Sequence, residues 1–181
     1  MNNAPLIQGR QIVLRAPIER DIEDRRLLGM TKECAEMIGS EFDKIQEFTH
    51  DHALTWYLRA SKHPCKWVVE HLGKCIGTVG LRLIEEDNKA KFAIELYDQT
   101  LYGKGIGTEV TQLVLRYAFL DKRYHKVFLR VLDYNHRGIA MYKKCGFTID
   151  GIDREGAKIQ GEYHSDIYMG ILKSEYEEIY K

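Results

Sequence analysis

The chain has no excess of charge, no long apolar run and no leader-like start. Its 27 Lys plus Arg equal its 27 Asp plus Glu, so the formal net charge of the 181 residues is zero at pH 7. A balanced charge gives no general attraction for nucleic acid or an anionic membrane. No stretch approaches the roughly 20 apolar residues of a membrane-spanning helix, and residues 1–9 lack the basic start and apolar run of a signal peptide. These absences predict a cytoplasmic protein without nucleic-acid or membrane partners.

Paired cysteines are also missing. The four cysteines show neither Cys-x-x-Cys spacing nor the clustering with histidine that is typical of metal sites. We therefore predict free thiols and no metal, and no sequence neighbour would activate one of them as a nucleophile. Apolar and charged contents of 44% and 30% are ordinary for a globular protein. With no repeat or linker, we expect one domain over residues 1–181.

What the chain does contain is a run of three alternating glycines. Gly103, Gly105 and Gly107 follow residues 92–97, which read as a strand, and they precede apolar residues that recur at helical spacing over 110–118. Glycine allows tight turns and a close approach of the backbone to a ligand. The unpaired N–H groups at the start of a helix attract anions. The pattern predicts a cradle for a pyrophosphate.

The residues of this loop allow other interpretations. The glycine spacing differs from the Gly-x-Gly-x-x-Gly pattern of dinucleotide sites, and no Gly-Lys-Ser/Thr closes the segment as in a P-loop. A plain loop before a capped helix is one alternative. A nucleotide-binding domain is another, which the absence of a Mg²⁺-ligand motif near the loop disfavours.

A second motif follows an apolar strand at residues 125–132. Asn135 precedes Tyr142 by seven residues, and Gly146 and Phe147 follow Tyr142 by four and five residues. Asn135 suits the N-cap of a helix, and Gly146 suits the residue just past its end. The strand before this motif is expected to run parallel to the strand before the glycine loop, because a helix connects the two.

The two motifs together resemble those of the GNAT N-acetyltransferases, in particular the branch of ribosomal-protein-alanine and polyamine acetyltransferases. The resemblance runs from Arg10 to Leu172 in the order of the elements. It implies an α/β fold with a mixed, largely antiparallel central sheet, helices on both faces and two splayed parallel strands. It also implies acetyl-CoA as co-substrate and an amine as acceptor.

The resemblance assigns binding roles as well. The loop backbone would hold the pyrophosphate, with Tyr102 where the family usually has Arg or Gln. Asn135 would bind the pantetheine arm, the Tyr142 hydroxyl would lie at the thioester sulfur, and an N–H near Leu96 and Tyr97 would bind the acyl oxygen. A helix cap and a core tyrosine are the structural alternatives for Asn135 and Tyr142. The predicted cofactor-binding residues are Leu96, Tyr97, Tyr102, Gly103, Lys104, Gly105, Ile106, Gly107, Thr108, Asn135 and Tyr142.

Tyr142 and Glu95 are the predicted catalytic residues. A thiol of pKa ~8.5 is a stronger acid than a phenol of pKa ~10, so full proton donation would be uphill by about 2 kcal/mol. Tyr142 is therefore expected to act chiefly as a hydrogen-bond donor to the thiolate. A Lys-like amine costs roughly 4–5 kcal/mol to deprotonate at neutral pH, which calls for a base. Glu95 is the predicted base, with Asp98 and the acidic residues of 33–47 as alternatives.

The acceptor is not specified by the sequence. A protein N-terminus, a polyamine, an amino-sugar drug and a small amino compound are all candidates, and the branch favours the first two. A non-catalytic acyl-CoA sensor or interaction module is the alternative to an enzyme. A homodimer that pairs through residues 163–172 as a free sheet edge is a further expectation.

Overall fold

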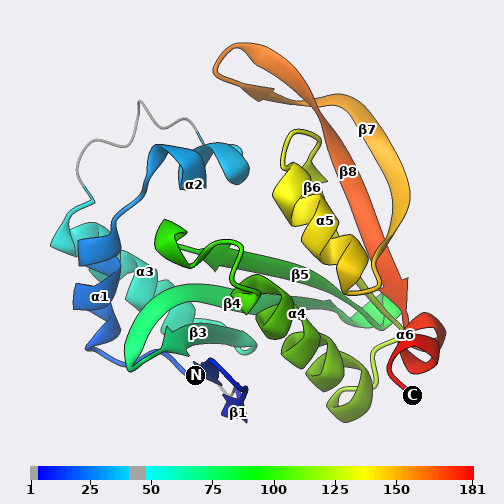
Figure 1. Cartoon of the computed structure of the whole chain (residues 1–181), viewed down its shortest axis with the longest axis horizontal. Coiled ribbons are helices and arrows are strands. Elements are labelled where there is room, and N and C mark those ends of the chain that lie inside the picture. Colours follow the sequence, from blue (N-terminus) through cyan, green and yellow to red (C-terminus); the bar gives the residue numbers. More distant parts are fainter. Residues whose placement is uncertain (1–3, 41–47) are drawn as a thin grey trace.

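The computed structural model describes residues 4–40 and 48–181, which form one mixed sheet with helices on both faces (Figure 1). The strands are β1 (Ile7–Gln8), β2 (Val13–Arg15), β3 (Lys66–His71), β4 (Lys74–Ile84), β5 (Lys89–Leu96), β6 (Lys126–Leu132), β7 (Thr148–Ile159) and β8 (Glu162–Leu172). The helices are α1 (Asp21–Leu28), α2 (Lys32–Met37), α3 (His50–Lys62), α4 (Ile106–Arg116), α5 (His136–Lys144) and α6 (Lys173–Ile179), with short turns η2 (Glu85–Asp87) and η3 (Gln99–Leu101) and a π-helical segment η4 (Tyr117–Asp121). Glu41, Asp43 and Glu47, which were among the alternative bases, lie outside the described residues.

The two parallel strands separate soon after they begin. In the sheet order β1-β2-β3-β4-β5-β6-β8-β7, β5 and β6 are parallel and the other neighbouring pairs are antiparallel. The parallel pairing of β5 with β6 covers residues 89–91 and 126–128, and beyond these residues the two strands diverge. Helix α4 makes the crossover that parallel neighbours require. The prediction of a mixed sheet with two splayed parallel strands is confirmed.

Each face of the sheet buries its apolar side chains under a different pair of helices (Figure 1). On one face, α4 and α5 join the strands in a main core that includes Phe92, Val110, Val114, Leu129 and Tyr142. On the other face, Leu28 of α1 and Trp56 of α3 pack against a smaller cluster that includes Tyr97. The position of a side chain along β5 therefore decides which helices it meets. No helix within the described ranges is long and apolar enough to cross a membrane.

The strand expected to be a free edge is an inner strand. β8 pairs with β6 on one side and with β7 on the other, and β7 is the outermost strand. The prediction of an edge at residues 163–172 is therefore wrong, because the chain runs outward along β7 first and returns inward through the turn at Gly161 (φ 89°). A homodimer stays a prediction, and the strands at the two edges of the described sheet are β1 and β7.

Helix α3 begins at a side-chain cap and turns a narrow stripe of small residues to the core. The Thr49 side chain accepts a hydrogen bond from His52 N–H at 3.3 Å, which caps the helix. Leu58 of this helix is apolar but 47% exposed. Ala53 and Ala60, two helical turns apart, form the buried stripe instead.

A buried ion pair fixes α1 against the sheet and gives a stability prediction. Asp21 is fully buried, and its carboxylate accepts two hydrogen bonds from Arg15, at 2.8 and 2.7 Å. Asp21→Asn removes this charge, but Arg15 keeps a second partner in Glu70, whose Oε2 lies 2.6 Å from Arg15 Nε. We therefore expect the free energy of unfolding to fall by about 2 kcal/mol, the value of hydrogen bonds to a charged group. Glu23→Gln is the control, since Glu23 pairs with Arg26 at the surface and exposed ion pairs contribute little to stability. Equal losses in urea denaturation would contradict this account of Asp21.

Candidate active site

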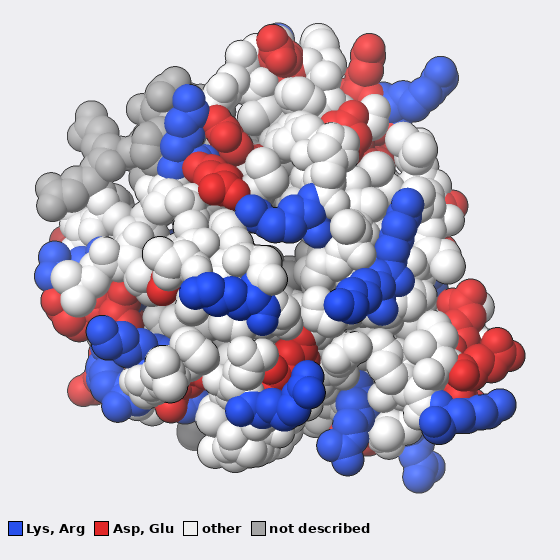
Figure 2. Space-filling model, viewed as in Figure 1, with Lys and Arg blue, Asp and Glu red and all other residues white. Residues whose placement is uncertain are grey.

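A cavity of about 480 Å³ lies where β5 and β6 separate. Its walls come from both parallel strands, from the glycine loop before α4, from α5 and from α2. Figure 2 shows the molecule hollowed near the centre of this view, with Lys and Arg side chains around the hollow. The splayed strands thus bring residues of both sequence motifs into one cavity.

The glycine loop presents backbone donors to this cavity. Gly103 and Gly105 have φ of 74° and 82°, which other residues adopt only with strain, and a Cβ at either position would meet nothing within 4 Å. Gly105 is the N-cap of α4, and its carbonyl accepts a hydrogen bond from Glu109 N–H at 3.0 Å. The N–H groups of residues 106–108 precede that bond, and all three residues line the cavity. An anion here would meet unpaired donors and the positive end of the helix.

The end of β5 offers one backbone N–H to the cavity. Tyr97 N–H donates to the Ile76 carbonyl at 2.8 Å, so it is already paired with β4. Leu96, one residue earlier, lies opposite Gly77 and alternates with Tyr97, so its N–H and carbonyl point away from β4 and toward the splay. Leu96 and Tyr97 were the two residues predicted to bind the acyl oxygen. Because of this strand register, the N–H of Leu96 is free to do so, whereas the N–H of Tyr97 is already bonded to β4.

The side chain of Tyr97 packs in the smaller hydrophobic cluster, on the face covered by α1 and α3. Its hydroxyl accepts a hydrogen bond from Trp56 Nε1 at 3.0 Å and lies 3.0 Å from the Thr78 hydroxyl. Burial raises the pKa of this phenol, so it stays protonated. Tyr97 is not among the described residues that line the cavity, and neither is Lys104 of the glycine loop.

Tyr102 holds the end of β5 from the loop side. Its hydroxyl donates to the Leu96 carbonyl at 2.7 Å, and its ring lies 4.0 Å from the guanidinium carbon of Arg137. Burial raises the pKa of Tyr102 to about 12, so the donor proton is present at neutral pH. Tyr102 therefore holds the Leu96 carbonyl in place. The sequence showed only that a tyrosine stands where the family usually has Arg or Gln, and it did not reveal this role.

Glu95 faces the opposite side of the sheet from the Leu96 side chain. Side chains alternate along a strand, so Glu95 shares the face of Tyr97, on which α1 and α3 pack. It is half-buried and lines the cavity. Cys34 lies nearby: burial raises the pKa of its thiol, and the charge of Glu95 raises it further. A thiol held protonated in this way is a poor nucleophile.

Tyr142 approaches the cavity from α5, on the face of the main core. Its ring lies edge-on to Phe92 and Phe147, with centroid distances of 6.2 and 5.8 Å. The side chain is 9% exposed and lines the cavity, and burial raises its pKa. None of the described residues makes a hydrogen bond to its hydroxyl, which can therefore donate into the cavity.

Asn135 caps α5, as its position in the second motif predicts. Its Oδ1 accepts a hydrogen bond from Gly138 N–H at 2.9 Å, and its Nδ2 donates to the Met37 carbonyl at 3.4 Å. The residue also lines the cavity, so a contact with a pantetheine arm stays a prediction. Gly146, with φ of 96°, ends the helix as expected.

The sequence did not single out several charged residues of the cavity. Arg137, Lys91, Arg130 and Lys144 all line it. Arg137 stands two residues after Asn135 inside the second motif, so the motif itself was a signal that could have drawn attention to it. Lys91 and Arg130 carried no comparable signal, because charged residues are common at strand positions that solvent can reach.

Comparisons with known proteins agree with this geometry. Residues 11–148 match the family model described as an acetyltransferase (GNAT) domain. The prophage-derived uncharacterized N-acetyltransferase YokL of Bacillus subtilis (strain 168) is 28% identical over 134 residues, 66% of this chain and 75% of that protein. Spermidine N(1)-acetyltransferase of Escherichia coli (strain K12) is 31% identical over 112 residues, 61% of this chain and 60% of that protein. The structure of spermidine N-acetyltransferase from Vibrio cholerae with CoA and spermine matches with a TM-score of 0.76 and 27% identity, over 92% of this chain and 98% of that one.

Proposed function

Because the chain belongs to the GNAT acetyltransferase family, whose members use acetyl-CoA, we propose that it transfers the acetyl group of acetyl-CoA to a primary amine by direct attack. One observation carries the proposal. The amides of residues 106–108, the inward-facing N–H of Leu96 and the hydroxyl of Tyr142 meet in a single cavity between diverging parallel strands. These are donors for a diphosphate, for an acyl oxygen and for a leaving sulfur, in that order.

In the proposed complex the diphosphate lies against the first turn of α4, and the pantetheine arm enters the splay. The acetyl oxygen accepts a hydrogen bond from Leu96 N–H, which Tyr102 orients through the Leu96 carbonyl. A fixed donor at this point stabilises the negative charge that develops on the oxygen in the transition state. The Tyr142 hydroxyl lies on the core side of the sheet, where the sulfur leaves.

The reaction then needs no intermediate bound to the protein. The lone pair of the amine attacks the acetyl carbon, a tetrahedral oxyanion forms, and the carbon–sulfur bond breaks to release a thiolate. Tyr142 donates a hydrogen bond to that thiolate, and Glu95 takes a proton from the amine on the other face of the sheet. Because burial raises the pKa of Tyr142, complete transfer of its proton becomes more unfavourable, which supports a hydrogen-bonding role.

Glu95→Gln tests the assignment of the base. We expect kcat at pH 7 to fall about 100-fold, and the deficit to shrink at higher pH, where more of the amine is already unprotonated. Asp98→Asn is the matched variant, because Asp98 accepts hydrogen bonds from Thr100 N–H at 3.0 Å and the Thr100 hydroxyl at 2.6 Å and so belongs to a turn. A larger loss of kcat in Asp98→Asn than in Glu95→Gln would move the role of base to Asp98.

The acceptor we propose is a polyamine, another small amine or a protein N-terminus. Relatives named for spermidine acetylation favour a polyamine, and the half-buried Glu95 in the cavity supports a cationic amine. The test is incubation of the protein with acetyl-CoA and a panel of amines and peptides, with mass spectrometry of the products. Acetyl-CoA binding without any transfer across the panel would favour the alternative of a non-catalytic sensor.

A further inference from the structure

An ion pair bridges the two sides of the cavity mouth. Arg137, in the first turn of α5, donates from Nη1 to Glu33 Oε1 of α2 at 2.7 Å. The guanidinium carbon also lies 4.0 Å from the centre of the Tyr102 ring, next to the glycine loop. Arg137 therefore stands between a carboxylate on α2 and the predicted diphosphate site.

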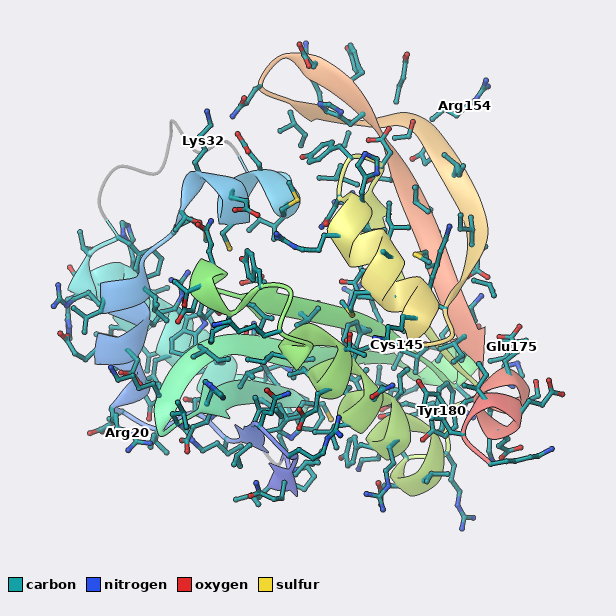
Figure 3. The ribbon with its side chains drawn as sticks, viewed as in Figure 1. Arg20, Lys32, Cys145, Arg154, Glu175 and Tyr180 are labelled. Carbon is teal, nitrogen blue, oxygen red and sulfur yellow. The ribbon has the colours of Figure 1, made fainter. Side chains whose placement is uncertain are left out.

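The surroundings of α2 make this bridge one of several links across the mouth. The Tyr134 hydroxyl, just before α5, donates to the Glu36 carbonyl at 2.6 Å, and Gln99 Nε2 donates to the Thr31 hydroxyl at 2.6 Å. α2 is thus tied both to α5 and to the segment after β5. Figure 3 labels Lys32, which marks the start of this helix in the view.

The Glu33–Arg137 pair is poorly shielded from water. The side chain of Arg137 is 48% exposed and that of Glu33 is 42% exposed, and ion pairs at such positions contribute little to stability. A diphosphate carries more negative charge than one carboxylate, and it offers oxygens that a guanidinium binds with two parallel hydrogen bonds. Arg137 shares its cavity with Gly103, Gly105 and Gly107. A diphosphate on this loop is therefore a stronger partner for Arg137 than Glu33 is.

We propose that Arg137 exchanges Glu33 for the cofactor diphosphate. The inference rests on the proposed acetyl transfer and adds to it a side-chain ligand for the diphosphate. In the free protein Glu33 holds the guanidinium of Arg137, and the binding of CoA breaks this ion pair.

The Glu33→Gln substitution tests the exchange of partners. It removes an acidic residue outside the diphosphate site, and we expect it to tighten the binding of CoA. Titration calorimetry of CoA should give a Kd roughly three-fold lower than that of the unaltered protein, because Arg137 no longer has a competing partner. Arg137→Gln should raise the Kd at least roughly ten-fold, because charge-assisted hydrogen bonds are lost. In the double variant, Glu33→Gln should add nothing to the effect of Arg137→Gln.

Glu36→Gln is the matched control, because it removes the same charge from the same helix. Glu36 lies 3.8 Å from Lys32 and has no pair with Arg137. Glu36→Gln should therefore leave the Kd for CoA unchanged, whereas Glu33→Gln should lower it. Pantetheine, which has no diphosphate, should bind Glu33→Gln and the unaltered protein equally.

Two failures are distinguishable. CoA binding that is the same in Glu33→Gln and Glu36→Gln overturns the exchange of partners and leaves the proposed acetyl transfer in place. No CoA binding by any variant or by the unaltered protein overturns both. A tighter complex of Glu33→Gln with pantetheine also contradicts the exchange, since that ligand offers Arg137 no diphosphate.

Discussion

Replacement of Gly107 by tryptophan is expected to abolish measurable binding of acetyl-CoA. A Cβ at this position would lie 3.7 Å from Leu96 Cδ1 and 4.0 Å from Met141 Cε, so the side chain projects into the splay between the parallel strands. An indole there fills the passage that the pantetheine arm requires and crowds the loop amides. We expect the Kd in calorimetry to rise more than about 100-fold, which corresponds to a loss of at least 2.7 kcal/mol.

Gly151→Trp is the control for the bulk of the new side chain. A Cβ at Gly151, on the outer strand β7, would meet nothing within 4 Å, and this residue does not line the cavity. The control variant should bind acetyl-CoA normally. Thermal unfolding of both variants checks that each is folded. Gly107→Trp with an undiminished affinity would show that the cofactor lies elsewhere.

Tyr142→Phe is expected to lower kcat about 100-fold or more while the affinity for acetyl-CoA stays the same. The substitution keeps the ring, which packs against Phe92 and Phe147, and removes the hydroxyl that donates into the cavity. A hydrogen bond formed only to the departing thiolate affects the transition state and leaves ground-state binding unchanged. Steady-state kinetics with calorimetry of acetyl-CoA separate the two effects.

A matched Tyr→Phe variant is available at Tyr176. This residue is buried in α6, where its ring stacks on that of Tyr180 at a centroid distance of 4.7 Å, outside the cavity lining. Tyr176→Phe should retain the kcat of the unaltered protein. Equal kcat in the Tyr142→Phe variant and the unaltered protein would remove Tyr142 from the mechanism.

The pH profile gives a further check on the phenol. Burial raises the pKa of Tyr142, so the protonated form that donates a hydrogen bond persists to a higher pH than for an exposed tyrosine. A decline of kcat due to ionisation of this phenol is therefore expected above the ordinary tyrosine value of about 10. A decline that begins below that value and is absent in Tyr142→Phe would contradict the buried, hydrogen-bonding phenol.

Some features of the site could be predicted from the sequence because they depend only on residues that are close together in the chain. Gly103 and Gly105 take backbone angles that glycine adopts readily, and Asn135 bonds to an amide three residues away. Such effects act within one turn of the chain, so the sequence predicted a strand, a loop with free amides and two capped helices in the observed order. The helix boundaries at Thr49 and Gly146 follow from the same rule.

Other features depend on how distant segments pack. The free N–H belongs to Leu96 and not to Tyr97 because of the register of β5 against β4, and a shift by one residue would reverse that choice. Glu33 and Arg137, 104 residues apart, meet because α2 and α5 flank the same splay. The inner position of β8 likewise depends on the order in which strands join the sheet.

The sequence by itself determined that this chain has a glycine loop before a helix, a capped second helix with Tyr142, and the order of elements of an acetyltransferase. Only the tertiary structure decided which backbone donor faces the cavity, which side of the sheet Glu95 occupies and which acid pairs with Arg137. The physical reason is one of range. Steric limits and caps act between near neighbours in the chain, whereas strand register and ion pairs across the cavity are set when the two faces of the sheet bury their apolar side chains.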